Sequence, residues 1–332
     1  MKPTARYLPH ARNRSRGGTP IAAAASLVGA AALVLSGCGT ENDSGGAAEG
    51  SVTLGFVNGA NTNFHSCLLK AVEATAKTDG AKVYSANSKQ DAGTELSNIE
   101  DMISRNVDAL IVQTVNVDAL EGDIAKAKAA GIPIFLTSVA TDDMSDVLGV
   151  AKVDLKKVGA MDAGWIGTDA AGKDVRVGIV AGAPGAASDL LVGGFKAGLP
   201  ANAKVVANQP GMFNPVKAQE VAENMIQANP DLDYAFVANE EMGFAVRKAF
   251  DAAGAEDVKI VTTNGTEEGL AAVKSGDFSA TVANSAMTIG QTAVKNTIAL
   301  LDKDKAVDKI ANIPLLLVTK DNLSEAPQYC PK

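Results

Sequence analysis

Short apolar runs rich in β-branched residues alternate, from residue 51 onward, with longer segments whose apolar residues recur every three to four positions. Ile99, Met102 and Ile103, for example, share one face of a helix at this spacing. The apolar runs predict strands at 52–57, 82–85, 108–113, 132–137, 147–151, 175–181, 203–207, 234–238, 258–263, 279–283 and 313–318. The segments between them predict helices at 65–79, 92–105, 117–130, 155–171, 187–198, 215–228, 241–253, 266–275 and 286–302.

This alternation of strands and helices predicts an α/β fold. Apolar strands that are separated by helices form parallel sheets with helices on both faces. The strands are too many for one such sheet within residues 51–332, so we expect two doubly wound parallel-sheet domains. The short strand at 147–151 leads into a helix rather than a hairpin, and we expect the chain to enter the second domain there.

The strand ends point to the place where a ligand would bind. Ligands of open α/β sheets lie beyond the carboxyl ends of the strands. In this chain those ends carry mostly small, amide and hydroxyl residues, at 58–65, 113–116, 137–140, 181–189, 239–240, 264–265 and 284–285. Two sheets that face each other across such ends would form a cleft lined by neutral hydrogen-bonding groups.

The first 37 residues are typical of an export signal, because a basic region precedes an apolar run at 21–35 and small residues follow. The sequence LSGC at 35–38 resembles the lipobox of bacterial lipoproteins, which predicts a lipidated Cys38 at the mature N-terminus. A plain secretory signal is the alternative. Residues 38–50 predict a flexible tether, so the protein would be extracytoplasmic and anchored to the outer face of the cell membrane.

The two other cysteines form an even pair once Cys38 is lipidated. We expect Cys67 and Cys330 to form a disulfide in this oxidising compartment, tying the C-terminal tail to the first helix. Two unpaired thiols are the alternative, because sequence spacing does not show proximity.

The charge balance disfavours polyanionic partners. The chain has 30 Lys and Arg against 38 Asp and Glu, and five of the basic residues precede position 38. The remainder carries 25 basic and 38 acidic residues, and this net charge of −13 would repel nucleic acid and anionic lipid heads. No apolar run after the signal approaches the ~18 residues that span a bilayer, so we expect membrane contact through the lipid anchor only.

Motifs of catalysis and cofactor binding are missing from the sequence. His65 is the only histidine after the signal, and no spacing of Cys or His suits zinc. The sequence has no nucleophile elbow and no P-loop, and the glycines at 178–185 do not form a dinucleotide-binding motif. We therefore expect no enzyme activity, no cofactor and no metal. A hydrolase that uses His65 is the alternative, and it would need a Ser or Cys beside the ring.

Arginine is scarce as well. Only Arg105, Arg176 and Arg247 follow the signal, and none is expected at the cleft, so capture of a carboxylate or phosphate lacks its usual residue. We infer an uncharged ligand; an anion held by a lysine or by helix N-termini is the alternative. The acidic pair Glu240-Glu241 is interpreted as solvated residues in the first turn of a helix.

Several segments resemble the type I periplasmic sugar-binding proteins of the ribose/galactose type. In unbroken order, they are Asn61–His65, Asp108–Gln113, Ala130–Pro133, Gln209-Pro210 with Phe213, Ala238–Met242, Asn264–Thr266 and Ala280–Asn284. The resemblance implies a monomeric two-lobed clamshell that closes around a small solute and delivers it to the permease and ATPase of an ABC importer. A lipoprotein that signals ligand binding to a membrane receptor is the alternative, as is a binder of a non-sugar solute.

The same resemblance implies where the lobes divide. Three crossovers are expected near 152, 284 and 312. They would give an N-terminal lobe of 51–152 plus 285–311 and a C-terminal lobe of 153–284 plus 312–332.

Carried over position by position, the resemblance implies eight ligand-binding residues, namely Phe64, His65, Gln113, Ser138, Phe213, Asn239, Asn264 and Asn284. This sequence departs from the family at several of them. Ser138-Val139 replaces an Asp-Arg pair, Leu190 replaces an arginine, and Asn264 replaces an aspartate. Because charge-assisted hydrogen bonds to sugar hydroxyls are lost, we expect a small neutral carbohydrate or polyol that need not be ribose.

Overall fold

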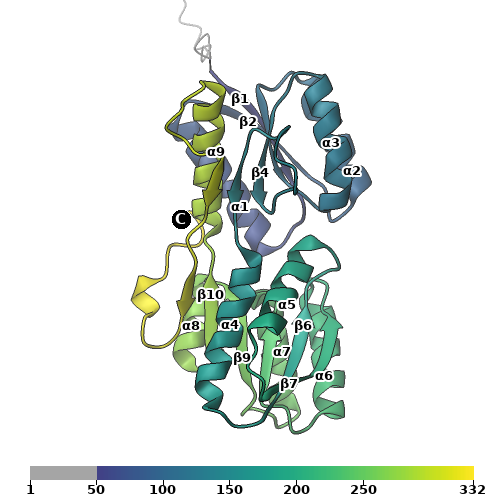
Figure 1. Cartoon of the computed structure of the whole chain (residues 1–332), viewed down its shortest axis with the longest axis vertical. Helices are drawn as coiled ribbons and strands as arrows, with labels where there is room; N and C mark the ends of the chain where they lie inside the picture. The colour runs from purple at the N-terminus through teal and green to yellow at the C-terminus, as the bar shows by residue number, and fades with distance from the viewer. Residues whose placement is uncertain (1–50) are drawn as a thin grey trace, which may run out of the picture. The chain divides into compact units, whose positions relative to one another are not determined.

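The computed structural model describes residues 51–332. The expected export signal, the lipidated Cys38 and the tether lie outside the described residues. Within them the chain forms two six-stranded sheets flanked by helices (Figure 1). The predicted α/β class with two doubly wound parallel sheets is therefore confirmed.

The first lobe is built around one sheet. Its elements are β1 (Thr53–Asn58), α1 (Asn63–Thr78), β2 (Lys82–Asn87), α2 (Ala92–Ser104), β3 (Ala109–Gln113), α3 (Val117–Ala129), β4 (Ile134–Ser138), β5 (Gly149–Lys152), α9 (Ala286–Leu301) and β11 (Ile310–Asn312). The strand order is β11-β5-β4-β3-β1-β2, and every pair is parallel. The carboxyl ends of these strands therefore lie along one edge of the sheet.

The second lobe repeats this plan. Its elements are α4 (Leu155–Ala170), β6 (Val175–Ala181), α5 (Ala186–Gly198), β7 (Ala203–Pro210), α6 (Pro215–Ala228), β8 (Tyr234–Val237), α7 (Glu240–Ala252), β9 (Lys259–Asn264), α8 (Glu267–Ser275), β10 (Ala280–Ala283), β12 (Leu316–Val318) and a 3-10 turn at Leu323–Glu325. The strand order is β12-β10-β9-β8-β6-β7. All pairs are parallel except β12 with β10, which is antiparallel.

The last strand predicted from the sequence, at 313–318, is replaced by two short strands in different sheets. Ile310–Asn312 forms β11 beside β5, and Leu316–Val318 forms β12 beside β10. Pro314 lies between them, and its ring nitrogen has no hydrogen to donate to a ladder. Asn312 pairs with Lys152 of the first sheet, so the third crossover follows this residue instead of preceding it.

The central strands are buried along their whole length. Every residue of β3, β4, β8 and β10 is buried, whereas the edge strands β2 and β7 are partly exposed. This matches strands covered by helices on both faces. In the second lobe the rings of Phe195 on α5 and Phe236 on β8 stack with centroids 4.4 Å apart.

Helices α4 and α5 approach each other closely at Gly194. A Cβ atom on Gly194 would lie 2.0 Å from the carbonyl oxygen of Lys156 on α4. Only glycine fits there, because any side chain would overlap the backbone of the neighbouring helix. Since α4 begins directly after the first crossover, this contact fixes how the chain enters the second lobe.

The C-terminal tail returns to the first lobe. Cys330 is joined to Cys67 on α1 by a disulfide, with 4.9 Å between their Cα atoms. The carbonyl oxygen of Tyr329 accepts a hydrogen bond from the backbone N–H of Met287, at the start of α9. Residues 329–330 therefore contact the first lobe, although the expected division placed all of 312–332 with the second.

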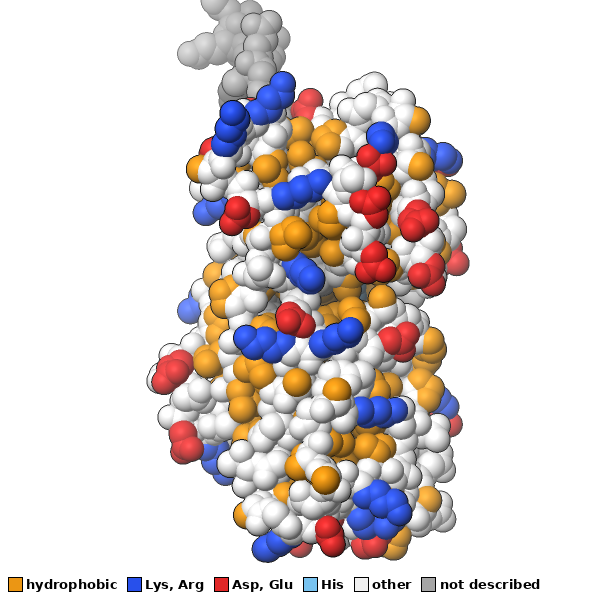
Figure 2. All heavy atoms as spheres, viewed as in Figure 1, with side chains coloured by type: hydrophobic (Ala, Val, Ile, Leu, Met, Phe, Trp, Pro, Cys, Tyr) orange, Lys and Arg blue, Asp and Glu red, His pale blue; other side chains and the backbone are white. Residues whose placement is uncertain are grey.

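The surface is polar and mixed in charge. On the face seen in Figure 2, acidic side chains gather over α2 and α3, with basic side chains among them. Lys126 pairs there with Glu100, and Lys128 pairs with Asp146 at 2.5 Å. Such exposed pairs contribute little to stability. Among the helices of residues 51–332, none has the length and apolar character needed to cross a bilayer.

Candidate functional site

A cavity of about 210 Å³ lies between the two lobes, at the carboxyl ends of strands from both sheets. All eight ligand-binding residues expected from the sequence line it: Phe64, His65, Gln113, Ser138, Phe213, Asn239, Asn264 and Asn284. Its volume is below the roughly 300–1,000 Å³ of pockets for drug-sized ligands. The cavity therefore suits a solute of few atoms.

In the first lobe, His65 and Gln113 form a short hydrogen-bonded chain with Thr62. The Nε2 atom of His65 lies 3.0 Å from Oε1 of Gln113, and its Nδ1 atom lies 2.8 Å from the hydroxyl of Thr62. Because Oε1 can only accept, Nε2 carries the ring proton and Nδ1 accepts from the Thr62 hydroxyl. Gln113 then keeps its NH₂ group as a donor for a ligand.

The imidazole of His65 is uncharged at neutral pH. Burial lowers its pKa to about 4, and the hydrogen bond with Gln113 opposes this shift only in part. The ring of Phe64 meets the His65 ring edge to face, with centroids 5.2 Å apart. The first lobe therefore offers the ligand an aromatic wall and a neutral polar chain.

Ser138 is a buried polar residue at the end of β4. Its hydroxyl has no hydrogen-bond partner among the described residues. Its backbone has a φ of +66°, a conformation that residues other than glycine seldom adopt. The cavity-lining residues Gln90, Phe213 and Asn264 have positive φ as well, so backbone strain gathers around this cavity.

The second lobe contributes three amides from neighbouring strand ends. The Oδ1 atom of Asn239 caps α7 by accepting from the backbone N–H of Met242, so its NH₂ group is directed elsewhere. The NH₂ group of Asn284 donates to the hydroxyl of Thr263, which leaves Oδ1 as an acceptor. Asn264 ends β9. Capping and lining of the cavity thus coexist at Asn239.

Phe213 places a second aromatic ring at the cavity. The ring rests on Gly182, where a Cβ atom would lie 2.1 Å from Cζ of Phe213. Gly182 therefore makes room for the ring. The sequence showed only that the glycines at 178–185 do not form a dinucleotide-binding motif, and it did not predict this contact with Phe213.

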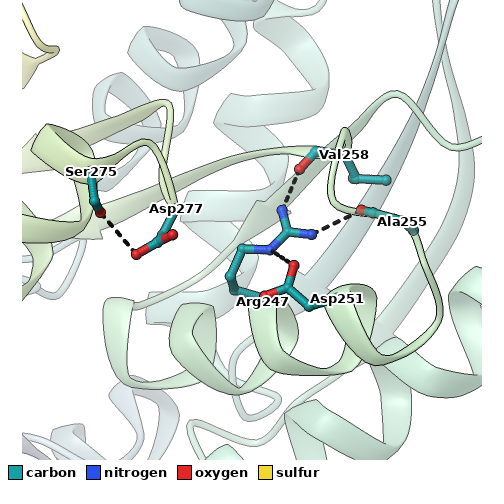
Figure 3. A network of polar contacts seen from close by, with 6 residues as sticks. All are labelled: Arg247, Asp251, Ala255, Val258, Ser275 and Asp277. Carbon is teal, nitrogen blue, oxygen red and sulfur yellow. Dashed lines mark hydrogen bonds and ion pairs between the residues drawn. The ribbon is translucent and has the colours of Figure 1, made fainter.

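No charged side chain occurs among the described residues that line the cavity. The three arginines of residues 51–332 form contacts elsewhere, as expected. Arg105 pairs with Asp101, and Arg176 pairs with Asp231. Arg247 bonds Asp251 and the carbonyl oxygens of Ala255 and Val258, at the far end of α7 (Figure 3). The cavity thus lacks the groups that usually hold an anion.

Several lining residues were not singled out from the sequence. Gln90 comes from the turn between β2 and α2, whereas Val153, Leu155 and Leu191 form part of an apolar wall. Val153 and Leu155 belong to the first crossover, and no local pattern marks them as ligand contacts. The strand-end rule does cover other lining residues, among them Thr62, Thr114 and Val139, because each lies within a range expected to face the ligand.

The interpretation of Glu240-Glu241 as a solvated pair is wrong. Glu240 is 1% exposed, and its carboxylate accepts hydrogen bonds from β10 and from the turn between β9 and α8. Glu241 is half-buried and accepts from the backbone N–H of Asn63, 3.2 Å away in the first lobe. Helix dipoles favour acids at these positions, but contacts between distant segments bury them.

Comparison with known proteins places this architecture in a family. The family model described as a periplasmic binding protein domain matches residues 54–305. The ribose import binding protein of Bacillus subtilis is 31% identical over 270 residues, which cover 81% of this chain and 87% of the relative. The xylitol-binding protein of Mycolicibacterium smegmatis is 28% identical, and the matched region covers 92% of this chain and 87% of the relative.

Solved structures show the same fold. One is the binding protein of the arabinose ABC transporter from Shewanella sp. ANA-3, bound to L-arabinofuranose. It has a TM-score of 0.77 and 26% identity, and the match covers 82% of this chain and 94% of that chain. Another is a solute-binding protein of an ABC transporter from Bacillus halodurans with bound myo-inositol. It has a TM-score of 0.78 and 23% identity, and the match covers 83% of this chain and 97% of that chain.

Proposed function

The chain belongs to the periplasmic binding protein domain family, and from this we propose that it is the solute-binding component of an ABC importer. It captures a small uncharged sugar or polyol between its two lobes and delivers it to the permease and ATPase. It has no enzymatic role. The observation that carries this proposal is the uncharged cavity, which is lined by amide, hydroxyl and aromatic side chains at the strand ends of both sheets.

The chemistry of the cavity supports a polyhydroxy ligand. Gln113 and Asn239 offer NH₂ donors, Asn284 offers an acceptor, and the Ser138 hydroxyl can do both. Phe64 and Phe213 supply aromatic surface for the apolar faces of a ring. Relatives that bind ribose or xylitol, and structures with bound arabinofuranose or myo-inositol, take ligands of this kind.

Affinity without charged groups requires many neutral contacts. Micromolar binding corresponds to about 8 kcal/mol, whereas one neutral hydrogen bond contributes about 0.5–1.5 kcal/mol. The apolar wall formed by Val153, Leu155 and Leu191 supplies part of the difference by burying ligand surface. A polyol or a deoxysugar with an apolar edge therefore suits the cavity better than a sugar that is polar on all sides.

The export signal and the lipobox-like sequence support an extracytoplasmic location. We propose that Cys38 carries the lipid that holds the protein at the outer face of the membrane, and that the protein acts as a monomer. A disulfide between Cys67 and Cys330 fits such an oxidising compartment. Mass spectrometry of the protein purified from membranes would show an N-terminus at Cys38 with attached acyl chains.

A calorimetric screen tests the ligand class. The chain without residues 1–38 is titrated with D-ribose, L-arabinose, xylitol, myo-inositol and glycerol, and with gluconate and ribose 5-phosphate as anions. We expect at least one neutral solute to bind and to raise the melting temperature. Tight binding of an anion, with no response to any neutral solute, would falsify the proposed ligand class.

Uptake assays test the transport role. Deletion of the gene is expected to abolish uptake of the radiolabelled solute identified in the screen, and the full-length gene should restore it. Unchanged uptake, together with loss of a transcriptional response to that solute, would favour a sensor instead.

A further inference from the structure

Glu240 is a buried carboxylate that the proposed ligand contacts leave unexplained. It is the first residue of α7 and 1% exposed, and it does not line the cavity. Its Oε1 atom accepts from the backbone N–H of Gly265 at 2.9 Å and from the hydroxyl of Thr281 at 2.7 Å. Its Oε2 atom accepts from the backbone N–H of Thr266 at 2.9 Å and from the hydroxyl of the same residue.

These four bonds connect segments of three neighbouring strands. Glu240 itself follows β8, Gly265 and Thr266 follow β9, and Thr281 lies within β10. The three amides of the second lobe belong to the same segments: Asn239 directly precedes Glu240, Asn264 directly precedes Gly265, and Asn284 directly follows β10, three residues after Thr281. One carboxylate thus links the backbone segments that carry all three amides.

The surroundings of the carboxylate leave it little freedom. A Cβ atom on Gly269 of α8 would lie 2.1 Å from Cδ of Glu240, so only a glycine leaves room for this side chain. The hydroxyl of Thr266 accepts from the N–H of Gly269 while it donates to Glu240, which fixes the direction of that bond. The turn at Gly265 has a φ of +80°, and the carboxylate holds its N–H.

A buried carboxylate is a costly way to stabilise a fold. Burial raises the pKa of Glu240, and the four donors oppose that shift. Apolar residues of similar volume often serve stability as well as a buried charge does. A residue of this kind is better explained by the geometry that it imposes on its neighbours.

We propose that Glu240 is a positioning residue, which sets the spacing of Asn239, Asn264 and Asn284 and thereby the ligand preference of the second lobe. This inference rests on the proposed function for its ligand-binding part. Its structural part, the placement of the amides, stands without a ligand.

The test compares E240Q with E267Q. Glu267 is the first residue of α8 and is exposed, so it matches Glu240 in type and in position on its helix. In E240Q one acceptor becomes an NH₂ donor that faces other donors. We expect NMR spectra of the ligand-free protein to show shifted or broadened side-chain NH₂ signals of Asn239 and Asn264 in E240Q, and wild-type signals in E267Q. Unchanged signals in E240Q would overturn the proposal.

Binding is measured with D-ribose, L-arabinose and xylitol on the same variants. For a solute that the wild type binds, we expect E240Q to weaken binding about tenfold and to change the affinity ratio between solutes, with E267Q close to the wild type. An equal loss for every solute would indicate a merely structural role and would refute control of ligand preference. If the wild type binds none of them, the ligand proposal fails for these solutes while the NMR comparison still decides the positioning role.

A second pair of variants covers the case in which E240Q does not fold. T281V removes one donor to the carboxylate without changing its charge, and T281S keeps the hydroxyl. We expect T281V to show the same NMR changes in a weaker form and T281S to resemble the wild type. Equal spectra for T281V and T281S would count against the proposal.

Discussion

His65 shows how one residue couples the cavity to pH. Its pKa is about 4 in the folded protein against 6.5 for the free side chain, because burial disfavours the charged imidazolium. Between these two values the unfolded chain binds a proton that the folded protein does not. The contribution of His65 to the free energy of unfolding is therefore fully present above pH 6.5. It is lost as the pH falls towards 4.

This pH dependence is measurable by denaturant unfolding between pH 7 and pH 4. We expect the free energy of unfolding to fall on acidification, and H65Q to show a smaller fall over the same interval. Residues 38–332 contain no other histidine, so the difference between the two curves isolates His65 from the carboxylates. Parallel curves would show that the imidazole is accessible to protons in the folded state.

Asp162, on α4, changes the pH dependence of stability in the opposite direction to His65. Both of its carboxyl oxygens are buried without a hydrogen-bond partner among the described residues, and burial, followed by the charge of Glu240, raises its pKa well above the usual value. A raised pKa gives a contribution to stability that is present at low pH and is lost as the pH rises through the folded value. Asp162 therefore destabilises the folded protein progressively as the pH rises above the ordinary pKa of an aspartate.

Replacing Asp162 by asparagine removes the titration. We predict that D162N reduces the decrease in unfolding free energy that accompanies a rise in pH above the ordinary pKa of an aspartate, as followed by chemical denaturation. D174N, at an exposed aspartate, serves as the control and should follow the wild type. A curve for D162N as steep as that of the wild type would assign the decrease to other groups.

At the scale of elements, the contact between α4 and α5 offers a matched pair of glycines. A Cβ atom on Gly194 would meet the α4 backbone, whereas one on Gly193 would meet nothing within 4 Å. We predict that G194A lowers the free energy of unfolding by about 1–3 kcal/mol through overpacking. G193A should raise it by about 0.5–1 kcal/mol, because alanine is the better helix former. Equal effects in thermal denaturation would mean that the helices can separate at little cost.

The C-terminal tail is a second element-scale feature. The Cys67–Cys330 bond closes a loop across a sequence separation of 263 residues, so it restricts the unfolded chain strongly. We predict that C330S lowers the free energy of unfolding by about 2–4 kcal/mol and that a reducing agent does the same to the wild type. Mass spectrometry without reduction checks that the bond forms. A reducing agent that leaves the melting temperature unchanged would show that the disulfide adds nothing to stability.

At the scale of the whole molecule, Glu241 connects the two lobes. Its carboxylate on α7 accepts from the N–H of Asn63 at the start of α1, where the partial positive charge of a helix N-terminus favours an anion. The hydrogen bond exists only when the lobes are near each other, so it favours the closed arrangement.

The effect on closure is measured by small-angle X-ray scattering of the ligand-free protein. We predict that E241A increases the radius of gyration, because the open form gains population, and that E267A does not. The ligand should bind E241A more weakly, since it must supply more of the closure energy. Identical scattering curves for the two variants would remove Glu241 from the control of closure.

Local patterns in the sequence predicted much of this molecule. The alternation of apolar runs and helical segments predicted the two parallel sheets, because spacing along the chain decides which faces become buried. The rule that ligands bind beyond strand ends, together with the family resemblance, singled out residues that the structure brings to one cavity. Asn239 illustrates why this works: it caps α7 and lies two residues after the end of β8, so its place follows from neighbours in the chain.

Tertiary structure alone decided the features that depend on partners far along the chain. Glu240 resembles any acid in a first helical turn, and it is buried because its partners lie 25, 26 and 41 residues away. Val153 and Leu155 become cavity walls only because segments of both lobes meet around the same cavity, and residues 310–318 divide between two sheets at a proline. Periodicity records which side of an element is apolar, but it carries no distance between elements, and burial and hydrogen bonding depend on those distances.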